Sequence, residues 1–238
     1  MEINTQIEVR VIAKGGKFLG DDVGGAEVSI YNALTGVLLK SGRTQGGSGD
    51  PNLMSIAINR TQTYPTDQAS LFFTSIAITE PTLLKVTARG PVGGLQSANT
   101  VTATQWMIPG TDIRGGDGLL LEIPGLMVQA MQPATHTNLT TATEKKVDFV
   151  ANVTMMCGCP IAPGTAWDPT LFEVGVQVQQ LGGPNGANFK LHYAGVTSQF
   201  TGSYTLPAAG NYIATIYARQ MSNGNSGCAR VSFFWEAS

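Results

Sequence analysis

The stretch GSYTLPAAGNY (residues 202–212) decides the fold of the C-terminal half of this chain. A run of strand-like residues stops at residues 207–210 (PAAG), and a new run begins with Tyr212. Alternation of apolar and polar residues indicates strands that bury one face, and a cluster of Pro and Gly between two such runs indicates a turn. The stretch therefore predicts one strand, a corner and a second strand.

The same alternation extends outward in both directions, and no helical stripe interrupts it. We expect an all-β chain of two tandem antiparallel β-sandwich domains, residues 1–131 and 132–238, with the polar, Thr-rich residues 132–146 as the best linker candidate. The Gly-rich residues 45–52 are expected to form a loop. The predicted strands cover residues 7–12, 26–31, 37–39, 53–59, 69–79, 81–90, 101–108 and 119–130, then 147–156, 172–180, 189–193, 198–206, 211–220 and 228–236.

Composition narrows the class of protein. Charged residues make up 13% of the chain, against roughly 25% in average soluble domains. The 131 N-terminal residues hold 9 basic and 11 acidic side chains, and the remainder holds 5 of each. Neither half carries a basic field, so nucleic acid is not an expected partner. Weakly charged β surfaces favour secreted, cell-surface or fibre-forming proteins, and unprotected strand edges favour a homo-oligomer or a protein partner.

Two observations bear on the compartment. No apolar run reaches 18 residues, so a transmembrane helix is not expected. Met1 leads directly into Glu2-Ile3-Asn4 without a basic start or an apolar segment, so no signal peptide is visible. The protein is then cytoplasmic, or it is extracellular or periplasmic after removal of a leader.

The N-terminal half carries three short motifs. They are residues 26–30 (AEVSI), the turn Thr35-Gly36 and residues 84–90 (LKVTARG). In this order they resemble the carboxypeptidase-regulatory-like (transthyretin-like) β-sandwich family over about residues 5–130, with long insertions around Gly46 and residues 112–118. The resemblance implies a seven-stranded sandwich with a binding or spacing role. It carries no functional residues over.

The corner at residues 202–212 resembles the penultimate corner of an immunoglobulin-like module. In that strand order, the loops that follow the first, third and fifth strands of the half lie at one end of the sandwich, because successive strands alternate in direction. We therefore expect these loops to gather Cys157, Cys159, His192, Met221 and Cys228 at one rim, near Trp167 and Asp168.

Sulfur chemistry is the most distinctive feature of the chain. Cys157-Gly158-Cys159 follows Met155-Met156, and Cys228 is the only other cysteine. A disulfide from Cys228 to Cys157 or Cys159 would join two loops. Alternatively, the rim could hold a soft metal, copper or zinc, through Cys157, Cys159, Cys228, His192 and Met221. A nucleophilic cysteine activated by His192 and oriented by Asp168 is a third interpretation, and inert buried thiols are the fourth.

The remaining candidate motifs favour no chemistry. His136 lies in a polar stretch where a solvated side chain is expected, and residues 112–118 predict a turn rather than a calcium loop. Catalysis by Ser, His and Asp has no supporting signature. We expect a non-catalytic binding or structural protein that contacts partners through the loop rim or strand edges. The alternative is a metal carrier or a cysteine-dependent enzyme that uses the rim.

Overall fold

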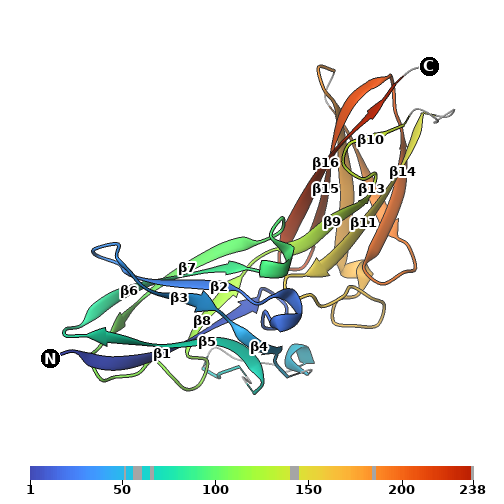
Figure 1. The fold of residues 1–238 in the computed structure, drawn as a ribbon. Coiled ribbons are helices and arrows are strands. Elements are labelled where there is room, and N and C mark those ends of the chain that lie inside the picture. The colour runs from blue at the N-terminus through green and yellow to red at the C-terminus, as the bar shows by residue number, and fades with distance from the viewer. Residues whose placement is uncertain (51, 56–60, 65–66, 140–144, 184–185, 237–238) are drawn as a thin grey trace. The chain divides into compact units, whose positions relative to one another are not determined.

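A computed structural model describes the chain except residues 51, 56–60, 65–66, 140–144, 184–185 and 237–238. Its regular elements are sixteen β-strands and four short 3-10 segments (Figure 1). They form two compact units: unit 1 consists of residues 1–125 and 156–159, and unit 2 of residues 126–155 and 160–238. No helix in the described part of the chain is long and apolar enough to cross a membrane.

Unit 1 contains two four-stranded sheets, with the strand orders β4-β5-β1-β8 and β3-β2-β6-β7. Neighbouring strands are antiparallel except β1 and β8, which are parallel. The strands are β1 (Ile3–Ala13), β2 (Glu27–Asn32), β3 (Leu38–Arg43), β4 (Gln45–Ser48), β5 (Ala69–Ile78), β6 (Thr82–Gly90), β7 (Asn99–Met107) and β8 (Leu119–Ile123), and the 3-10 segments are η1 (Asp21–Val23), η2 (Leu53–Ser55) and η3 (Val92–Gly94).

Alternate residues of both sheets form the core of unit 1, because successive side chains of a strand point to opposite faces. The buried set includes Ile7, Val9, Val11, Val28, Ile30, Leu84, Val86 and Ala88. A smaller cluster surrounds Ile12 on the other face of β1, and it contains Phe18, Leu53 and Ala69 with the partly buried Tyr64 and Leu120. The two sheets therefore pack face to face as a β-sandwich.

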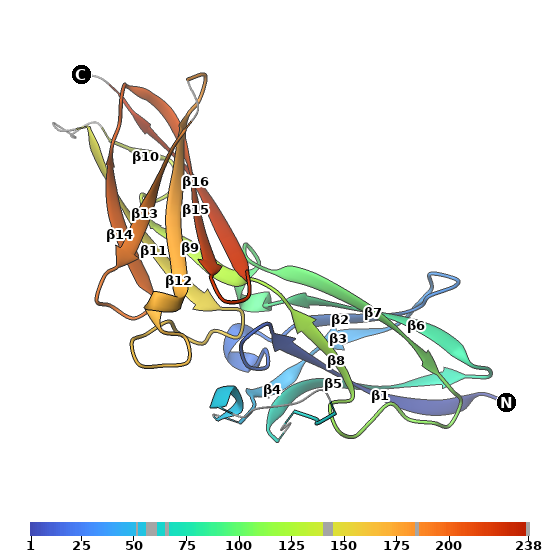
Figure 2. The same ribbon diagram turned by 180° about the vertical axis from the view of Figure 1, so that it is seen from behind.

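Unit 2 contains one series of eight strands in the order β10-β16-β15-β12-β13-β14-β11-β9. Strand β13 pairs with β12 through Leu191 and with β14 from His192 onward, so it links two layers (Figure 2). Phe149 of β11 contacts Phe233 of β16 across these layers, with 6.0 Å between ring centroids. The elements are β9 (Leu126–Gln132), β10 (Thr137–Asn138), β11 (Lys146–Met155), η4 (Pro169–Leu171), β12 (Phe172–Gln180), β13 (Ala187–Tyr193), β14 (Gln199–Thr205), β15 (Gly210–Gln220) and β16 (Ser226–Trp235).

The corner predicted at residues 202–212 is built around Tyr212, near the start of β15. Its ring is buried and stacks on Phe233, with centroids 5.5 Å apart and planes 10° apart. Its hydroxyl donates a hydrogen bond to the carbonyl oxygen of Ala208. A tyrosine that bonds back to the preceding corner in this way is a hallmark of immunoglobulin-like sandwiches. The prediction of an all-β chain of two sandwiches is confirmed.

The structure corrects several strand predictions in the N-terminal half. Residues 119–130 form two strands, β8 and β9, because the chain turns at Pro124-Gly125, where Gly125 has a φ of +136°. Leu53–Ser55 forms the 3-10 segment η2 instead of a strand, and residues 56–60 lie outside the described residues. Part of the predicted loop at residues 45–52 is strand β4, which pairs with β5.

The division between the units also differs from the predicted boundary at residues 131/132. It lies at residues 125/126, because β9 pairs with β11 of unit 2. The polar residues 132–139 contain strand β10, which pairs in parallel with β16. Leu139 extends this contact, since its amide donates to the carbonyl of Phe234 at 2.9 Å. Residues 140–144 of the predicted linker lie outside the described residues.

Replacing Tyr212 with Phe should lower the free energy of unfolding by about 1 kcal/mol, because the Ala208 carbonyl loses its donor while the ring stack remains. Tyr204→Phe is a matched control: Tyr204 stacks on Phe189 with the same 5.5 Å between centroids. Urea denaturation followed by circular dichroism measures both changes. Equal losses in the two variants would show that the corner bond has no special role.

A second prediction concerns the limits of unit 2. Residues 126–238 expressed alone should fold, whereas residues 140–238 should be markedly less stable. The shorter fragment loses β9 and β10, and with β9 the buried side chains of Leu126 and Val128. Thermal unfolding and circular dichroism of both fragments test this, and equal stability of the two would contradict the assignment of β9 to unit 2.

Candidate functional site

The Cys157-Gly158-Cys159 turn belongs to unit 1 and begins two residues after the end of β11. Gly158 has a φ of +78°, a conformation that L side chains rarely adopt. A Cβ at this position would also lie 2.6 Å from Cγ1 of Val23. Glycine is therefore required here both by the backbone and by space, and the turn brings the two cysteine side chains together.

The sulfur of Cys157 is fully buried and has two hydrogen-bond donors. The thiol of Cys159 donates to it, and so does the backbone N–H of Lys17, at an N···S distance of 3.4 Å. The hydrogen bond from Cys159 lowers the pKa of Cys157 to about 7, against the opposing effect of burial. Near neutral pH, the pair can hold a thiolate on Cys157.

Cys159 is half-buried, and its pKa is raised. The main cause is its hydrogen bond to Cys157, and burial and the charge of Cys157 act in the same direction. The nearby Lys17 charge opposes this rise, and that of Asp22 adds to it. The two sulfurs therefore form one hydrogen-bonded pair.

A tight turn after β1 makes room for the Cys157 sulfur. Ala13 accepts the amide of Gly16 and donates its own amide to the carbonyl of Lys17, at 2.9 Å in each case. A Cβ on Gly16 would lie 3.1 Å from the Cys157 sulfur. Sequence reasoning missed these residues, because no local pattern links positions 140 residues apart.

The five sequence-predicted ligands fall into separate groups. Cys157 and Cys159 belong to unit 1, and Cys228, His192 and Met221 belong to unit 2. All three cysteines are free thiols, so the structure does not contain the expected disulfide with Cys228. Cys228 is exposed and lies opposite Tyr217 in the β15–β16 ladder. In the described part of the chain, no three His, Cys, Asp or Glu side chains form a metal-binding group. A site that uses all five ligands stays a prediction.

Within unit 2, backbone hydrogen bonds join several of the loops that were predicted to lie at one end. The amide of Met221 donates to the carbonyl of Leu171 at 3.0 Å, and that of Ser198 to the carbonyl of Ile161 at 2.8 Å. His192 and Met221 line one surface pocket of about 380 Å³. Glu173 also lines it, and its pKa is lowered mainly by the hydrogen bond from Arg219.

Asp168, the expected orienting group of a catalytic cysteine, has another role. Its Oδ1 accepts hydrogen bonds from the amide and the hydroxyl of Thr170, at 2.9 and 2.7 Å, and its Oδ2 accepts the amide of Gly164. The bond from the Thr170 amide caps η4, and the three bonds together lower the pKa of Asp168, the Thr170 side chain having the largest effect. Its hydrogen-bonding capacity is therefore used within its own loop.

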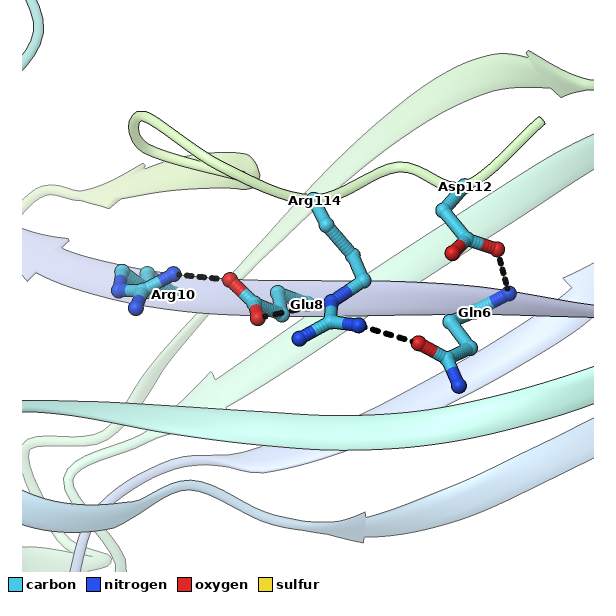
Figure 3. Close-up of polar contacts among 5 residues, drawn as sticks. All are labelled: Gln6, Glu8, Arg10, Asp112 and Arg114. Atoms are coloured by element: carbon cyan, nitrogen blue, oxygen red, sulfur yellow. Dashed lines mark hydrogen bonds and ion pairs between the residues drawn. The ribbon is translucent and has the colours of Figure 1, made fainter.

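Unit 1 also contains a polar cluster along β1 (Figure 3). Glu8 lies between two arginines: its Oε2 is 3.0 Å from Nη1 of Arg10, and its Oε1 is 3.2 Å from Nε of Arg114. Arg114 also donates to the side-chain oxygen of Gln6, and the backbone N–H of Gln6 donates to Asp112. Burial raises the pKa of Glu8, but the hydrogen bonds and charges of the two arginines outweigh it and hold the pKa below its usual range.

This cluster fastens the loop after β7 to β1 instead of forming a ligand site. The carbonyl of Ile113 accepts the amide of Glu8 at 3.0 Å, and its amide donates to the carbonyl of Gln6 at 2.8 Å. Asp117, the second carboxylate of this loop, accepts the amide of Tyr64. Residues 112–118 thus form a turn held by backbone contacts, and their two carboxylates have separate partners.

Replacing Glu8 with Gln should lower the free energy of unfolding by about 2 kcal/mol near neutral pH, because Arg10 is only 6% exposed and loses its counter-charge. A lowered pKa stabilises the folded state above the ordinary glutamate pKa, and this stabilisation is lost as pH falls through the folded pKa. The difference between wild type and variant should therefore shrink in acid. Denaturant titrations across pH measure it.

The control for this experiment is Glu27→Gln, which removes an exposed ion pair with Arg89 at 3.5 Å. Exposed pairs contribute roughly 0–1 kcal/mol. A Glu8→Gln effect no larger than that of Glu27→Gln, or one that grows as pH falls, would contradict the role given to Glu8.

Comparison with known proteins gives a limited result. No protein-family model matches the chain, and no curated protein matches it. An engineered protein is 16% identical, with a TM-score of 0.35; the match covers 55% of this chain and 24% of the other. The fibronectin(III)-like modules of Clostridium thermocellum CbhA are 12% identical, with a TM-score of 0.32; the match covers 98% of this chain and 94% of the other. Tandem titin Ig domains are 10% identical, with a TM-score of 0.26; the match covers 100% of this chain and 98% of the other. TM-scores this low carry no argument about function, so the sandwich assignment depends on strand order.

Proposed function

We propose that this chain is a non-catalytic structural or binding protein that associates with a second copy of itself through strand β7 (Asn99–Met107). The supporting observation is that β7 is a long, uncharged strand at the edge of a sheet. It pairs with β6 from Asn99 to Met107, and the described residues place no strand on its other side. Such an edge offers a row of N–H and C=O groups to another chain.

The other sheet edges carry features that oppose pairing. Strand β3 contains Lys40 and Arg43, the five-residue strand β8 contains the exposed Glu122, and β4 has four residues with a register shift. In unit 2, β10 has two residues. Strand β9 begins close against β16, since a Cβ on Gly227 would come within 2.1 Å of the carbonyl oxygen of Leu126. Charges, short length and covered edges are the usual protections against edge pairing, and β7 has no charged residue, proline or glycine.

The side chains of β7 suit pairing with an identical strand. Thr100, Thr102, Thr104 and Trp106 alternate along one face and are exposed, Trp106 by 55%. A two-fold axis at Ala103 would place Thr102 opposite the partner subunit's Thr104. Thr–Thr pairs across antiparallel strands are favourable, and no like charges meet. This symmetric arrangement supports a homodimer over a one-sided contact.

Composition supports two further parts of the proposal. The 13% of charged residues favours an extracellular or periplasmic location. The transthyretin-like resemblance of residues 5–130 favours a binding or spacing role for unit 1. The low charge content and the resemblance both agree with a protein that self-associates through its strand edges and surface.

The double variant Thr102→Lys/Thr104→Lys should abolish self-association, because the two-fold arrangement would bring lysines of the two copies opposite each other. The matched control is Ser203→Lys/Thr205→Lys, which adds the same charge to exposed positions of β14, an interior strand. Sedimentation velocity should show a dimer for wild type and control, and a monomer for the β7 variant.

A wild-type chain that remains monomeric at the highest soluble concentration would refute the proposal. So would a β7 variant that dimerises as well as the control. Thermal unfolding of both variants shows whether the added charges leave the monomer folded.

A further inference from the structure

The Cys157-Gly158-Cys159 turn has a chemistry that self-association does not use. The positive-φ turn at Gly158 holds its two sulfurs in a hydrogen bond with each other, and Cys157 is sealed from solvent while Cys159 is half-buried. Two sulfurs held this close on one turn can bridge a soft monovalent cation. Because the turn already brings the sulfurs together, binding requires loss of protons and little rearrangement of the backbone.

We propose that this pair is a two-coordinate site for Cu(I), with Cys157 and Cys159 as its only protein ligands. Soft thiolates select Cu(I), zinc and iron–sulfur clusters, and of these Cu(I) can be held by two thiolates alone in a near-linear arrangement. This inference is independent of the self-association proposed above.

The number of available ligands favours copper over zinc. Structural zinc sites take four ligands in a tetrahedral arrangement. The described residues provide no group of three or more His, Cys, Asp or Glu side chains. The Met156 sulfur packs beside Gly125, where a Cβ would lie 3.1 Å from it. The two thiolates are therefore too few protein ligands for a structural zinc site, and they suffice for two-coordinate Cu(I).

The surroundings suit a complex with one net negative charge, which two thiolates and Cu(I) produce. The backbone N–H of Lys17 points at the Cys157 sulfur at 3.4 Å, and the Lys17 charge acts favourably on Cys159. Asp22 acts in the opposite direction. Donors and charges that stabilise a thiolate also stabilise a thiolate bound to a metal.

The two cysteines differ in solvent exposure, and this difference indicates which of them binds Cu(I) first. Cys159 reaches solvent and Cys157 does not, so Cu(I) would first meet the Cys159 sulfur and displace its proton. Bonding to Cys157 then completes the site. Each Cu(I) bound releases the protons that the two sulfurs carried, and no sulfur is oxidised.

The test is anaerobic titration of the reduced full-length chain with Cu(I) in competition with bicinchoninic acid. We expect one Cu(I) per chain in the wild type. Cys157→Ser and Cys159→Ser should each weaken binding by more than about 100-fold, because loss of a residue that only hydrogen-bonds to a metal ligand already costs roughly 10–100-fold. The matched control Cys228→Ser should bind as the wild type does, since Cys228 is exposed on β16.

A measurement on the wild type alone avoids any folding defect of the variants. Bound Cu(I) should protect Cys157 and Cys159 from alkylation, as read by peptide mass spectrometry, and leave Cys228 reactive. X-ray absorption at the copper edge should show two sulfur neighbours. The proposal is overturned if the wild type binds Cu(I) no better than a Cys157→Ser/Cys159→Ser variant, if Cys228→Ser also loses the metal, or if Zn(II) competes for the site at equal concentration.

Discussion

The register between β9 and β11 is the constraint on which the sulfur site depends. Leu126 lies opposite Met155 in this antiparallel pair. The residues just outside the pair, Gly125 and Met156, must then be neighbours, and the Met156 side chain fills the space beside Gly125 where a Cβ would otherwise lie. The ladder thus brings the chain back to unit 1 at residue 156. A shift by one residue would exchange the faces of β11 and move both cysteines.

Strands of unit 2 could be predicted closely because their alternation is uninterrupted. The runs predicted at residues 172–180 and 211–220 match β12 (Phe172–Gln180) and β15 (Gly210–Gln220) to within one residue. The prediction of a single strand at residues 119–130 was wrong, because its apolar residues outweighed the turn signal of Pro124-Gly125. Residues 137–138 could not be recognised as a strand, because β10 depends on backbone pairing with β16 and polar side chains give no alternation.

In the candidate site too, some features could be predicted from the sequence pattern and others come from tertiary packing. Alternation of strand direction placed His192 and Met221 at one end of unit 2, and both line the same pocket. The spacing of Cys157 and Cys159 predicted two neighbouring sulfurs. What completes the site comes from the turn after β1, where Gly16 leaves room for a sulfur and Lys17 donates to it. That contact arises from tertiary packing, which sequence periodicity does not encode. Cys228 is an exposed free thiol on the β15–β16 ladder, so the predicted disulfide is absent from the structure.

Burying a thiolate is unfavourable unless donors replace the water that it loses. The structure supplies the Cys157 sulfur with a thiol proton and a backbone N–H before any ligand arrives. Gly158 and Gly16 meet the steric demands of this arrangement, one through its positive φ and the other through the missing Cβ. Folding therefore bears the free-energy cost of ordering and desolvating the sulfurs. Binding sites organised in advance bind more tightly because that cost no longer opposes association. A soft cation that replaces the thiol protons would find its ligands, the Lys17 N–H and a nearby positive charge already in place.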